Sequence, residues 1–362
     1  MKKLKVISVV GARPQFIKAA PVSRALRERH EEILVHSGQH YDYEMSDVFF
    51  EQLGIPKPDF NLAVGSGSHA RQTGEMMPML EELFVERMPD LVLVYGDTNT
   101  TLAAGLAASK LGIPVAHVEA GLRSYNRAMP EEINRIVVDH ISDVLLCPTR
   151  ASVINLEAEG ITNGVHLVGD VMLDTARFFA ENVDSVGTLE QFGLEAGEYY
   201  FATVHRAGNS DSVSHLSAII EAFVHLDKPV LWAVHPRTSA NLERFDLDDR
   251  VDSTKRIKAV PPVSYIETIS LLGSAAGLLT DSGGMQKEAY FFGIPCVTLR
   301  EETEWVETVE LGWNTLVGAD TERITAAVAE LAKPTDRPDV YGDGRAAEEI
   351  VNALEAHMGG NW

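Results

Sequence analysis

The chain has 362 residues, with 31 basic and 53 acidic side chains and a formal net charge of −22. A single hydrophobic core usually stops growing at about 250–300 residues, so a chain of this length is expected to form two domains. Nucleic acids and anionic membranes are not expected as partners, because both repel a strongly acidic surface. An anionic ligand would therefore need a local cluster of cations.

Neither a metal site nor a covalent framework is predicted. Cys147 and Cys296 lie among apolar residues and are expected to be buried free thiols. The 12 histidines show no metal-ligand spacing, and no G-x-G-x-x-G or P-loop pattern occurs, so no cofactor is expected. The apolar run near the N-terminus ends at Gly11, too short for a signal peptide, and no stretch is long enough to span a membrane. We expect a cytoplasmic protein.

Short apolar runs rich in β-branched residues alternate with helical patterns almost from end to end. The predicted strands are residues 5–10, 33–37, 91–95, 115–119, 144–148, 199–204, 230–234, 277–280 and 295–299. Helices include residues 19–29, 100–111, 133–141, 214–226, 265–273 and 285–292. This alternation predicts the α/β class, with two Rossmann-like doubly wound domains facing a cleft.

The domain boundary is expected near residue 178. Residues 174–198 are acidic, interrupted by glycines and poor in strand character, which is typical of a hinge. The predicted domains are residues 1–177 and 178–345. An apolar stripe along the tail, formed by Ala347, Ile350, Val351 and Leu354, predicts a terminal amphipathic helix within residues 346–362.

Charged residues follow the predicted strands of the first domain. Arg13 and Lys18 come after the first strand, close to a helix N-terminus, which favours an anion site over two solvated charges. Asp97, Glu119 and Glu131 follow later strands or open helices. Three carboxylates at one side of a domain are suited to acid–base chemistry at carbon. The alternative is that Asp97 and Glu131 only stabilise helix starts.

In the second domain, Ser282, Gly283 and Gly284 follow a strand and open a helix. Ser282 can cap that helix, while the glycines leave backbone amides open to a phosphate. Glu288 lies on the first turns and can accept hydrogen bonds from ribose hydroxyls. This pattern predicts a nucleotide site, and a plainly capped helix is the alternative.

Two further strand ends of the second domain carry basic groups. His205 and Arg206 end its first strand, and His235 ends the next. A His–Arg pair at such a place can bind and protonate a departing phosphate. Capping or core roles are the alternative for each histidine.

The segments GARPQFIKAAP, VYGDTNTT, HVEAGLRS, MPEEINR, TVHRAGN, VHP and TDSGGMQKEA occur in the order typical of one family. The chain resembles the non-hydrolysing UDP-N-acetylglucosamine 2-epimerases over nearly its whole length. The resemblance implies a glycosyltransferase-B-like fold whose C-terminal helix crosses back to the first domain. It also implies a homodimer acting in polysaccharide biosynthesis.

The implied reaction inverts C2 of the amino sugar by losing UDP, forming 2-acetamidoglucal, and re-adding UDP after protonation on the other face. By motif match, Asp97, Glu119 and Glu131 handle the C2 proton, and His205 assists the departing diphosphate. The remaining implied residues bind or balance charge: Arg13, Lys18, Arg135, Arg206, His235, Ser282, Gly283, Gly284 and Glu288.

The exact substrate and reaction stay open. Gly208 stands where the family usually has glutamate, and some segments are closer to a branch acting on UDP-2,3-diacetamido-glucuronic acid. The carboxylate of that sugar would need an extra cation, for which Arg123 or Arg127 are candidates. A hydrolysing epimerase and a retaining glycosyltransferase of the same fold are the two rival reactions.

The resemblance also raises a second, regulatory nucleotide-sugar site. The matching positions are Gln39, His40, Tyr41, Asp42, Arg71, Arg206 and His235. Because a carboxylate at Asp42 repels a diphosphate, we expect the site to be absent and the substrate dependence to be hyperbolic.

Overall fold

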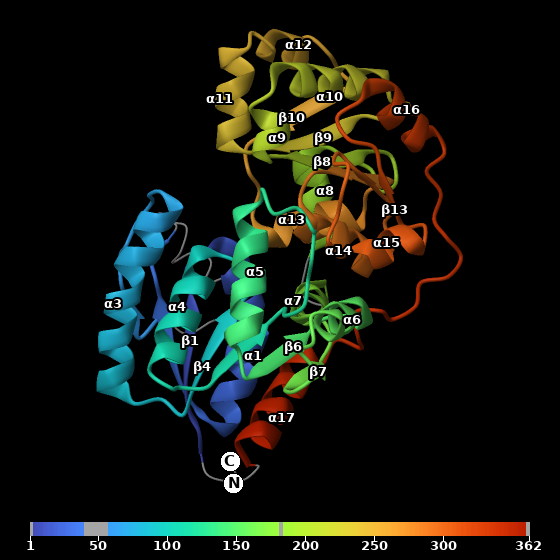
Figure 1. Ribbon diagram of the computed structural model, residues 1–362. Coiled ribbons are helices and arrows are strands. Elements are labelled where there is room, and N and C mark those ends of the chain that lie inside the picture. Colours follow the sequence, from blue (N-terminus) through green and yellow to red (C-terminus); the bar gives the residue numbers. More distant parts are fainter. Residues whose placement is uncertain (1–2, 40–56, 181–183, 360–362) are drawn as a thin grey trace. The chain divides into compact units, whose positions relative to one another are not determined.

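The computed structural model describes residues 3–39, 57–180 and 184–359. The chain divides into two compact units. Unit 1 comprises Met1–Thr175 together with Asp339–Trp362, and unit 2 comprises Ala176–Pro338. Each unit is built around its own parallel sheet (Figure 1).

Unit 1 holds a seven-stranded sheet in the order β3-β2-β1-β4-β5-β6-β7. The strands are β1 (Lys5–Val10), β2 (Glu31–His36), β3 (Phe60–Asn61), β4 (Leu91–Tyr95), β5 (Val115–Val118), β6 (Val144–Cys147) and β7 (Val165–Leu167). All neighbouring strands pair in parallel. The order reverses at β1, so the carboxyl ends of β1, β4 and β5 lie at the switch point where such sheets bind ligands.

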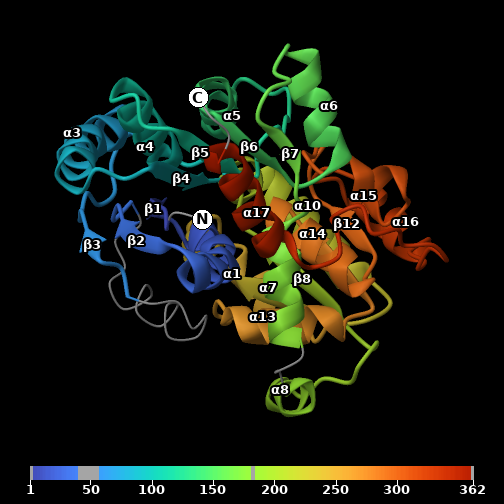
Figure 2. The same ribbon diagram turned by 90° about the horizontal axis from the view of Figure 1, so that it is seen from below.

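Helices cover both faces of this sheet. They are α1 (Arg13–Arg29), α3 (His69–Arg87), α4 (Asn99–Lys110), α5 (Pro130–Ile141), α6 (Arg150–Ala158) and α17 (Ala346–Gly359). Helix α7 (Val171–Ala180) crosses the limit between the two units, because Thr175 belongs to unit 1 and Ala176 to unit 2. Alternate residues of the central strands, such as Ile7 and Val9, pack with α3, α4 and α5 in one core. On the other face, α1 and α17 lie side by side (Figure 2).

The terminal helix α17 belongs to unit 1. Arg29 of α1 donates to Asn352 Oδ1 at 2.9 Å, and the neighbouring His30 Nε2 lies 3.2 Å from Glu355 Oε1. At its start, the carboxylate of Asp174 accepts hydrogen bonds from the amides of Ala346 and Ala347. A carboxylate at a helix N-terminus is favourable because it satisfies unpaired amides there.

Unit 2 holds a six-stranded parallel sheet in the order β10-β9-β8-β11-β12-β13. Its strands are β8 (Tyr200–Val204), β9 (Val230–Val234), β10 (Ile257–Val260), β11 (Gly277–Thr280), β12 (Cys296–Thr298) and β13 (Asn314–Leu316). Its helices are α8 (Ser185–Phe192), α9 (Ala207–Ser210), α10 (Val213–His225), α11 (Pro236–Arg244), α12 (Asp248–Asp252), α13 (Tyr265–Gly273), α14 (Gly283–Phe292), α15 (Val306–Glu310) and α16 (Thr321–Ala329). One core lies between the sheet and α10 and α16, and another between the sheet and α13 and α14.

The predicted α/β class with two parallel-sheet domains is confirmed, including the return of the last helix to the first domain. The predicted domain limits at 177/178 and 345/346 stay predictions. The first helix begins at Arg13, six positions before the expected start at residue 19. Cys147 and Cys296 are buried free thiols, as expected. Among the described residues, no helix combines the length and apolar character needed to cross a membrane.

Candidate active site

The carboxyl ends of β1 and β4 are joined by the buried side chain of Gln15. Its Oε1 accepts from the amides of Gly11 and Ala12 at 2.8 and 3.0 Å, and its Nε2 donates to Tyr95 O at 2.8 Å. Gly11 is needed for this close approach, since a Cβ there would lie 2.2 Å from Thr100 Oγ1. Arg13 opens α1 here, and its side chain lies outside the described part of the structure.

One turn further along α1, Lys18 forms an ion pair with Glu119, which directly follows β5. Both side chains are nearly buried, with 13% and 7% of their surfaces exposed. Glu119 has a φ of 73°, a left-handed conformation that is strained for a residue with a side chain and that clusters at functional sites. The turn that follows β4 contacts the end of β5, because the amide of Gly96 donates to the carbonyl oxygen of Val118 at 3.0 Å.

Asp97 follows Gly96 and is held by α5. Its Oδ2 lies 2.9 Å from Arg135 Nε and 2.8 Å from Arg135 Nη2, and Asn134 Nδ2 donates to its carbonyl oxygen at 2.9 Å. The helix cap is the next residue, Thr98, whose hydroxyl accepts from the amide of Thr101. Asp97 is therefore not an N-cap, which removes the alternative interpretation of this residue.

Arg135 also binds a second carboxylate. Its Nη1 lies 2.6 Å from Glu132 Oε2. Burial alone would raise the pKa of Glu132, but hydrogen bonds from Ser124 and Tyr125 and the charge of Arg135 hold that pKa below its usual range. Glu132 thus serves as a fixed anion that orients Arg135 toward Asp97. No signal in the sequence distinguishes it from an ordinary acid at a helix start.

Glu131 differs from these groups. It lies on the first turn of α5, half-buried, and its side chain makes no hydrogen bond or ion pair with any other described residue. Residues three and four apart on a helix share a face, so Glu131 is on the same side of α5 as Asn134 and Arg135. It is therefore near Asp97 and remains open to a ligand.

Arg123 is corrected as a candidate cation for an acidic sugar. Only 1% of its side chain is exposed, and it is bound by Asp139 at 2.6 Å and Glu159 at 2.7 Å. Arg127 is exposed and stays a candidate.

In unit 2, the buried carboxylate of Asp281 shapes the loop that carries His205 and Arg206. It accepts from their backbone amides at 3.0 Å each and from Asn209 Nδ2 at 3.1 Å. The His205 and His235 rings are 5.9 Å apart. Burial, followed by the positive charges of Arg206 and His235, lowers the pKa of His205 against an opposing effect of Asp281. Asp281 has a positioning role that its place in the sequence did not reveal.

The start of α14 lies at the carboxyl end of β11. Ser282 occupies the N-cap position, but its hydroxyl does not cap the helix, which corrects the expected capping bond. A Cβ on Gly283 would lie 2.3 Å from Glu304 Oε1, whereas one on Gly284 would lie 4.0 Å from its nearest neighbour, Ser282 Oγ. Glu288 is buried, with 3% of its surface exposed. Uncapped amides and an exposed glycine suit this helix start to anion binding.

The residues of a second nucleotide-sugar site are placed only in part. Gln39 hydrogen-bonds Thr100, while His40, Tyr41 and Asp42 lie outside the described residues. Arg71 is exposed on α3 and paired with Glu75. Nothing among residues 3–39, 57–180 and 184–359 groups three His, Cys, Asp or Glu side chains in a way that could hold a metal ion.

The fold and these strand-end groups define a two-unit parallel α/β protein with carboxylates, cationic side chains and histidines at the carboxyl ends of its strands. A family model for UDP-N-acetylglucosamine 2-epimerase matches residues 24–355. A UDP-N-acetylglucosamine 2-epimerase homolog of Methanococcus maripaludis is 48% identical over 97% of this chain and 99% of its own. UDP-2,3-diacetamido-2,3-dideoxy-D-glucuronate 2-epimerase of Pseudomonas aeruginosa is 47% identical over the same shares.

A solved structure agrees with these sequence matches. The UDP-N-acetylglucosamine 2-epimerase of Methanocaldococcus jannaschii, in complex with UDP-N-acetylglucosamine and UDP, has a TM-score of 0.90. It is 41% identical over 98% of this chain and 100% of that chain. This chain belongs to the UDP-N-acetylglucosamine 2-epimerase family, which confirms the resemblance.

Proposed function

We propose that this chain inverts C2 of a UDP-linked 2-acetamido sugar, converting UDP-N-acetylglucosamine to UDP-N-acetylmannosamine. The main support is the pairing of two carboxylates with cations at adjacent strand ends. Asp97 with Arg135, and Glu119 with Lys18, follow the neighbouring strands β4 and β5. Acids held at one edge of a sheet suit proton transfer at a fixed carbon.

The proposed route is elimination followed by re-addition. The C2 proton becomes removable when UDP leaves C1 and cations balance its charge. The C2–H electrons form the C1–C2 double bond of 2-acetamidoglucal as the C1–O bond breaks. Protonation of C2 on the opposite face and return of UDP to C1 complete the inversion. Asp97, Glu119 and Glu131 would exchange the proton, with Arg13, Lys18 and Arg135 balancing charge.

The nucleotide would be held by unit 2. Ser282 and the amides of Gly283 and Gly284 would bind the diphosphate, and Glu288 the ribose, while His205, Arg206 and His235 add cationic donors. A ring with a lowered pKa, as in His205, is neutral in the free protein and can take up a proton when the diphosphate arrives.

The second candidate substrate is UDP-2,3-diacetamido-glucuronic acid. It is favoured by the 47% identity to the epimerase for that sugar. Within the loop that precedes α5, Arg127 is the exposed arginine that could meet the sugar's carboxylate, because Arg123 is already bound by two carboxylates.

The two substrates and the rival reactions are separated by one assay. The protein is incubated in D2O with each UDP-sugar, and the products are read by NMR. Inverted UDP-sugar carrying deuterium at C2 supports the proposal and identifies the substrate. Release of UDP with free N-acetylmannosamine would indicate a hydrolysing epimerase. Neither product from either sugar would contradict the proposal.

We further propose that the protein acts in the cytoplasm as a homodimer in polysaccharide biosynthesis. The acidic composition and the family support this assignment. Light scattering of the purified chain would measure its mass, and a monomer would contradict the dimer.

A further inference from the structure

A buried histidine lies next to both turns that carry the proposed acid–base residues. His117, on β5, has no exposed side-chain surface. Its Nε2 is 2.7 Å from the carbonyl oxygen of Gly96, and its Nδ1 is 2.7 Å from Asp139 Oδ1 on α5. The ring therefore connects the turn at Gly96, just before Asp97, to helix α5, which also carries the Arg135 that binds Asp97.

Asp139 connects the same ring to the second turn. Its Oδ2 accepts from the amide of Gly121 at 3.1 Å, within the turn that follows Glu119. The same oxygen lies 2.6 Å from Arg123 Nη1. A single buried carboxylate thus contacts the turns of both proposed bases, through His117 on one side and Gly121 on the other.

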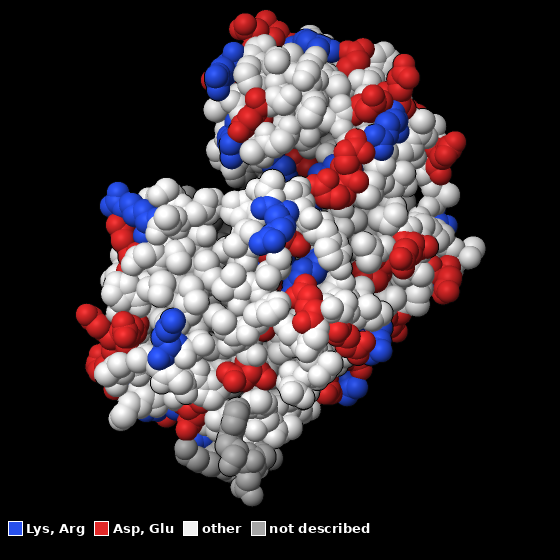
Figure 3. Space-filling view, in the orientation of Figure 1, with Lys and Arg blue, Asp and Glu red and all other residues white. Residues whose placement is uncertain are grey.

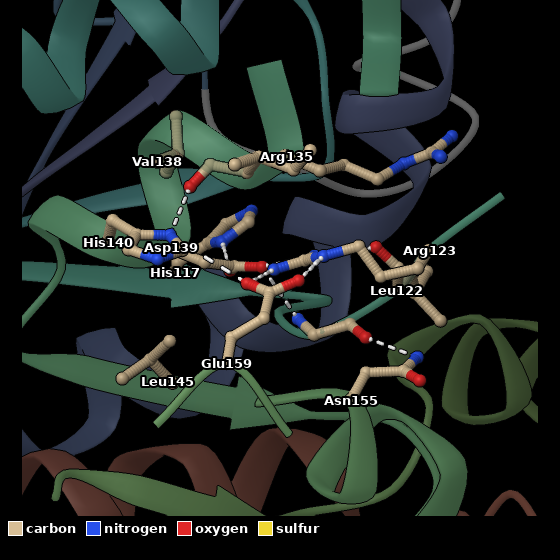
Figure 4. Close-up of polar contacts among 12 residues, drawn as sticks. His117, Leu122, Arg123, Arg135, Val138, Asp139, His140, Leu145, Asn155 and Glu159 are labelled. Atoms are coloured by element: carbon tan, nitrogen blue, oxygen red, sulfur yellow. Dashed lines mark hydrogen bonds and ion pairs between the residues drawn. The ribbon is translucent and has the colours of Figure 1, made fainter. Parts of the chain in front are cut away.

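Ion pairs connect Asp139 through Arg123 to Glu159, which lies partly at the surface. Arg123 donates from Nε and Nη2 to the two carboxylate oxygens of Glu159 at 2.7 and 2.8 Å. Glu159 is 28% exposed, whereas Asp139 is fully buried. Figure 4 shows the side chains of His117, Asp139, Arg123 and Glu159 gathered into one connected group. Buried charges cost several kcal/mol each unless they are paired, and here each has a partner of opposite sign.

The hydrogen bonds assign the protonation state of the ring. A carbonyl oxygen only accepts, so Nε2 must donate to Gly96. Asp139 is ionised, because the guanidinium of Arg123 lies 2.6 Å from its other oxygen and a neighbouring positive charge favours the carboxylate. Although burial opposes it, hydrogen bonding and charge from His117 and then Arg123 keep the pKa of Asp139 below its usual range. Nδ1 must then donate as well, and a ring that donates from both nitrogens is an imidazolium.

The other titratable groups near the His117 ring do not account for its second proton. On β6, burial and then the charge of Asp139 raise the pKa of the Cys147 thiol to about 12, so it stays neutral. Near the Gly96 turn, Glu119 is paired with Lys18. The carboxylate that contacts the ring directly is that of Asp139.

We propose that His117 is a positioning residue for the epimerisation: its hydrogen bonds to Gly96 and Asp139 keep the turns of Asp97 and Glu119 at a fixed spacing. In the wild-type protein, Asp139 also holds the ring as an imidazolium. The turns need such anchors because Gly96, Glu119 and Gly121 all have positive φ values, of 62°, 73° and 80°. The effect of His117 on turnover rests on the proposed function.

The protonation state is tested in the wild-type protein, without any turnover. NMR of ¹⁵N-labelled histidine at pH 7 should show one ring protonated at both nitrogens, as the two hydrogen bonds require. The resonance is assigned by its loss in His117→Phe. A His117 ring that carries a single proton at pH 7 would overturn the assignment, whether or not the protein is an epimerase.

The positioning role is tested by two variants. His117→Phe removes the donor to Gly96, and kcat for C2 inversion should fall by about 10²-fold, as misplaced reacting groups do, with UDP affinity unchanged. Asp139→Asn can accept from Gly121 and donate to Nδ1, which leaves a neutral ring that still donates to Gly96. It should retain most of the kcat that His117→Phe loses.

Val115→Ala is the matched control, because Val115 is a buried residue of the same strand whose backbone hydrogen-bonds Asp143. It should lower the melting temperature yet leave kcat unchanged below unfolding. If His117→Phe also keeps its kcat, or if Asp139→Asn loses as much kcat as His117→Phe, the positioning role is wrong. An inactive wild-type protein would instead contradict the proposed function, leaving the NMR test valid.

Discussion

At the residue scale, the carboxylates proposed for proton transfer differ in how firmly they are held. Asp97 is bound to Arg135, and Glu119 to Lys18, so both carboxylates are oriented by a cation. Glu131 makes no bond to any other described residue. The carboxylate of Glu131 can therefore contact a ligand without first breaking a bond to the protein. The carboxylates of Asp97 and Glu119 are instead held in one orientation by their cations.

Asp97→Asn and Glu131→Gln should each lower turnover by about 10²–10⁴-fold, the usual effect of losing a positioned acid or base. Because Glu131 bonds no other residue within 3–39, 57–180 and 184–359, its variant should keep the wild-type melting temperature. Deuterium wash-in at C2 measures the chemistry. Glu82→Gln, an exposed carboxylate on α3, is the control. Full wash-in rates in both variants would show that neither carboxylate handles the C2 proton.

Binding of UDP should be coupled to proton uptake at His205. Burial is the largest cause of its lowered pKa, so the free ring is neutral at pH 7. A bound diphosphate favours the charged form and raises that pKa, so the ring gains a proton between the two pKa values. Calorimetry in buffers of different ionisation enthalpy should detect this uptake near pH 6–7, and His205→Asn should abolish it. Unchanged uptake in the variant would assign the proton to another group.

At the element scale, the start of α14 combines two glycines with different constraints. Gly283 packs against the side chains of Glu304 and Trp305, so an added Cβ there would require the Glu304 carboxylate to move. Gly284 has open space around its Cα, and the fold does not require a glycine there. A helix normally disfavours glycine by about 1 kcal/mol relative to alanine, so Gly284 is better explained by a ligand approaching the backbone.

Alanine at these two positions should therefore act in different ways. Gly284→Ala should leave the free energy of unfolding unchanged or slightly higher, while weakening UDP binding. Gly283→Ala should destabilise unit 2, because its Cβ would meet Glu304 Oε1 at 2.3 Å. Urea unfolding and UDP titration measure the two effects. If Gly284→Ala binds UDP with wild-type affinity, the diphosphate does not bind at the start of α14.

At the scale of the whole molecule, unit 1 is assembled from both ends of the chain. Ile350, Val351 and Leu354 of α17 are buried against it, although they follow unit 2 in sequence. In the face shown in Figure 3, acidic and basic side chains are scattered among neutral ones. A net charge of −22 is therefore compatible with local cationic side chains such as Arg206.

Leu354→Ala should destabilise unit 1 by about 2–5 kcal/mol, the usual cost of removing a buried leucine side chain. Hydrogen exchange should then increase in β1 and leave β8 of unit 2 unchanged. Glu349→Ala, on the exposed side of the same helix, should change stability by less than about 0.5 kcal/mol. Equal losses of protection in β1 and β8 would show that α17 does not belong to unit 1 alone.

The sequence by itself determined the α/β class and the central strands. These strands are buried on both faces, so they appear as continuous apolar runs: the predicted ranges 5–10, 91–95, 230–234 and 277–280 match β1, β4, β9 and β11. The four strands that were not predicted, β3, β7, β10 and β13, are the edges of the two sheets. Edge strands are short and partly exposed, so their apolar patterns are too weak to identify.

The candidate site divides in the same way. Residues that follow a strand, such as Asp97, Glu119 and His205, are visible in sequence because strand ends of parallel sheets carry ligand groups. Only the tertiary structure showed that Arg123 is already paired, that Thr98 caps α4 instead of Asp97, and that His117 anchors the Gly96 turn. These contacts join residues distant in sequence, and only packing decides which charges meet.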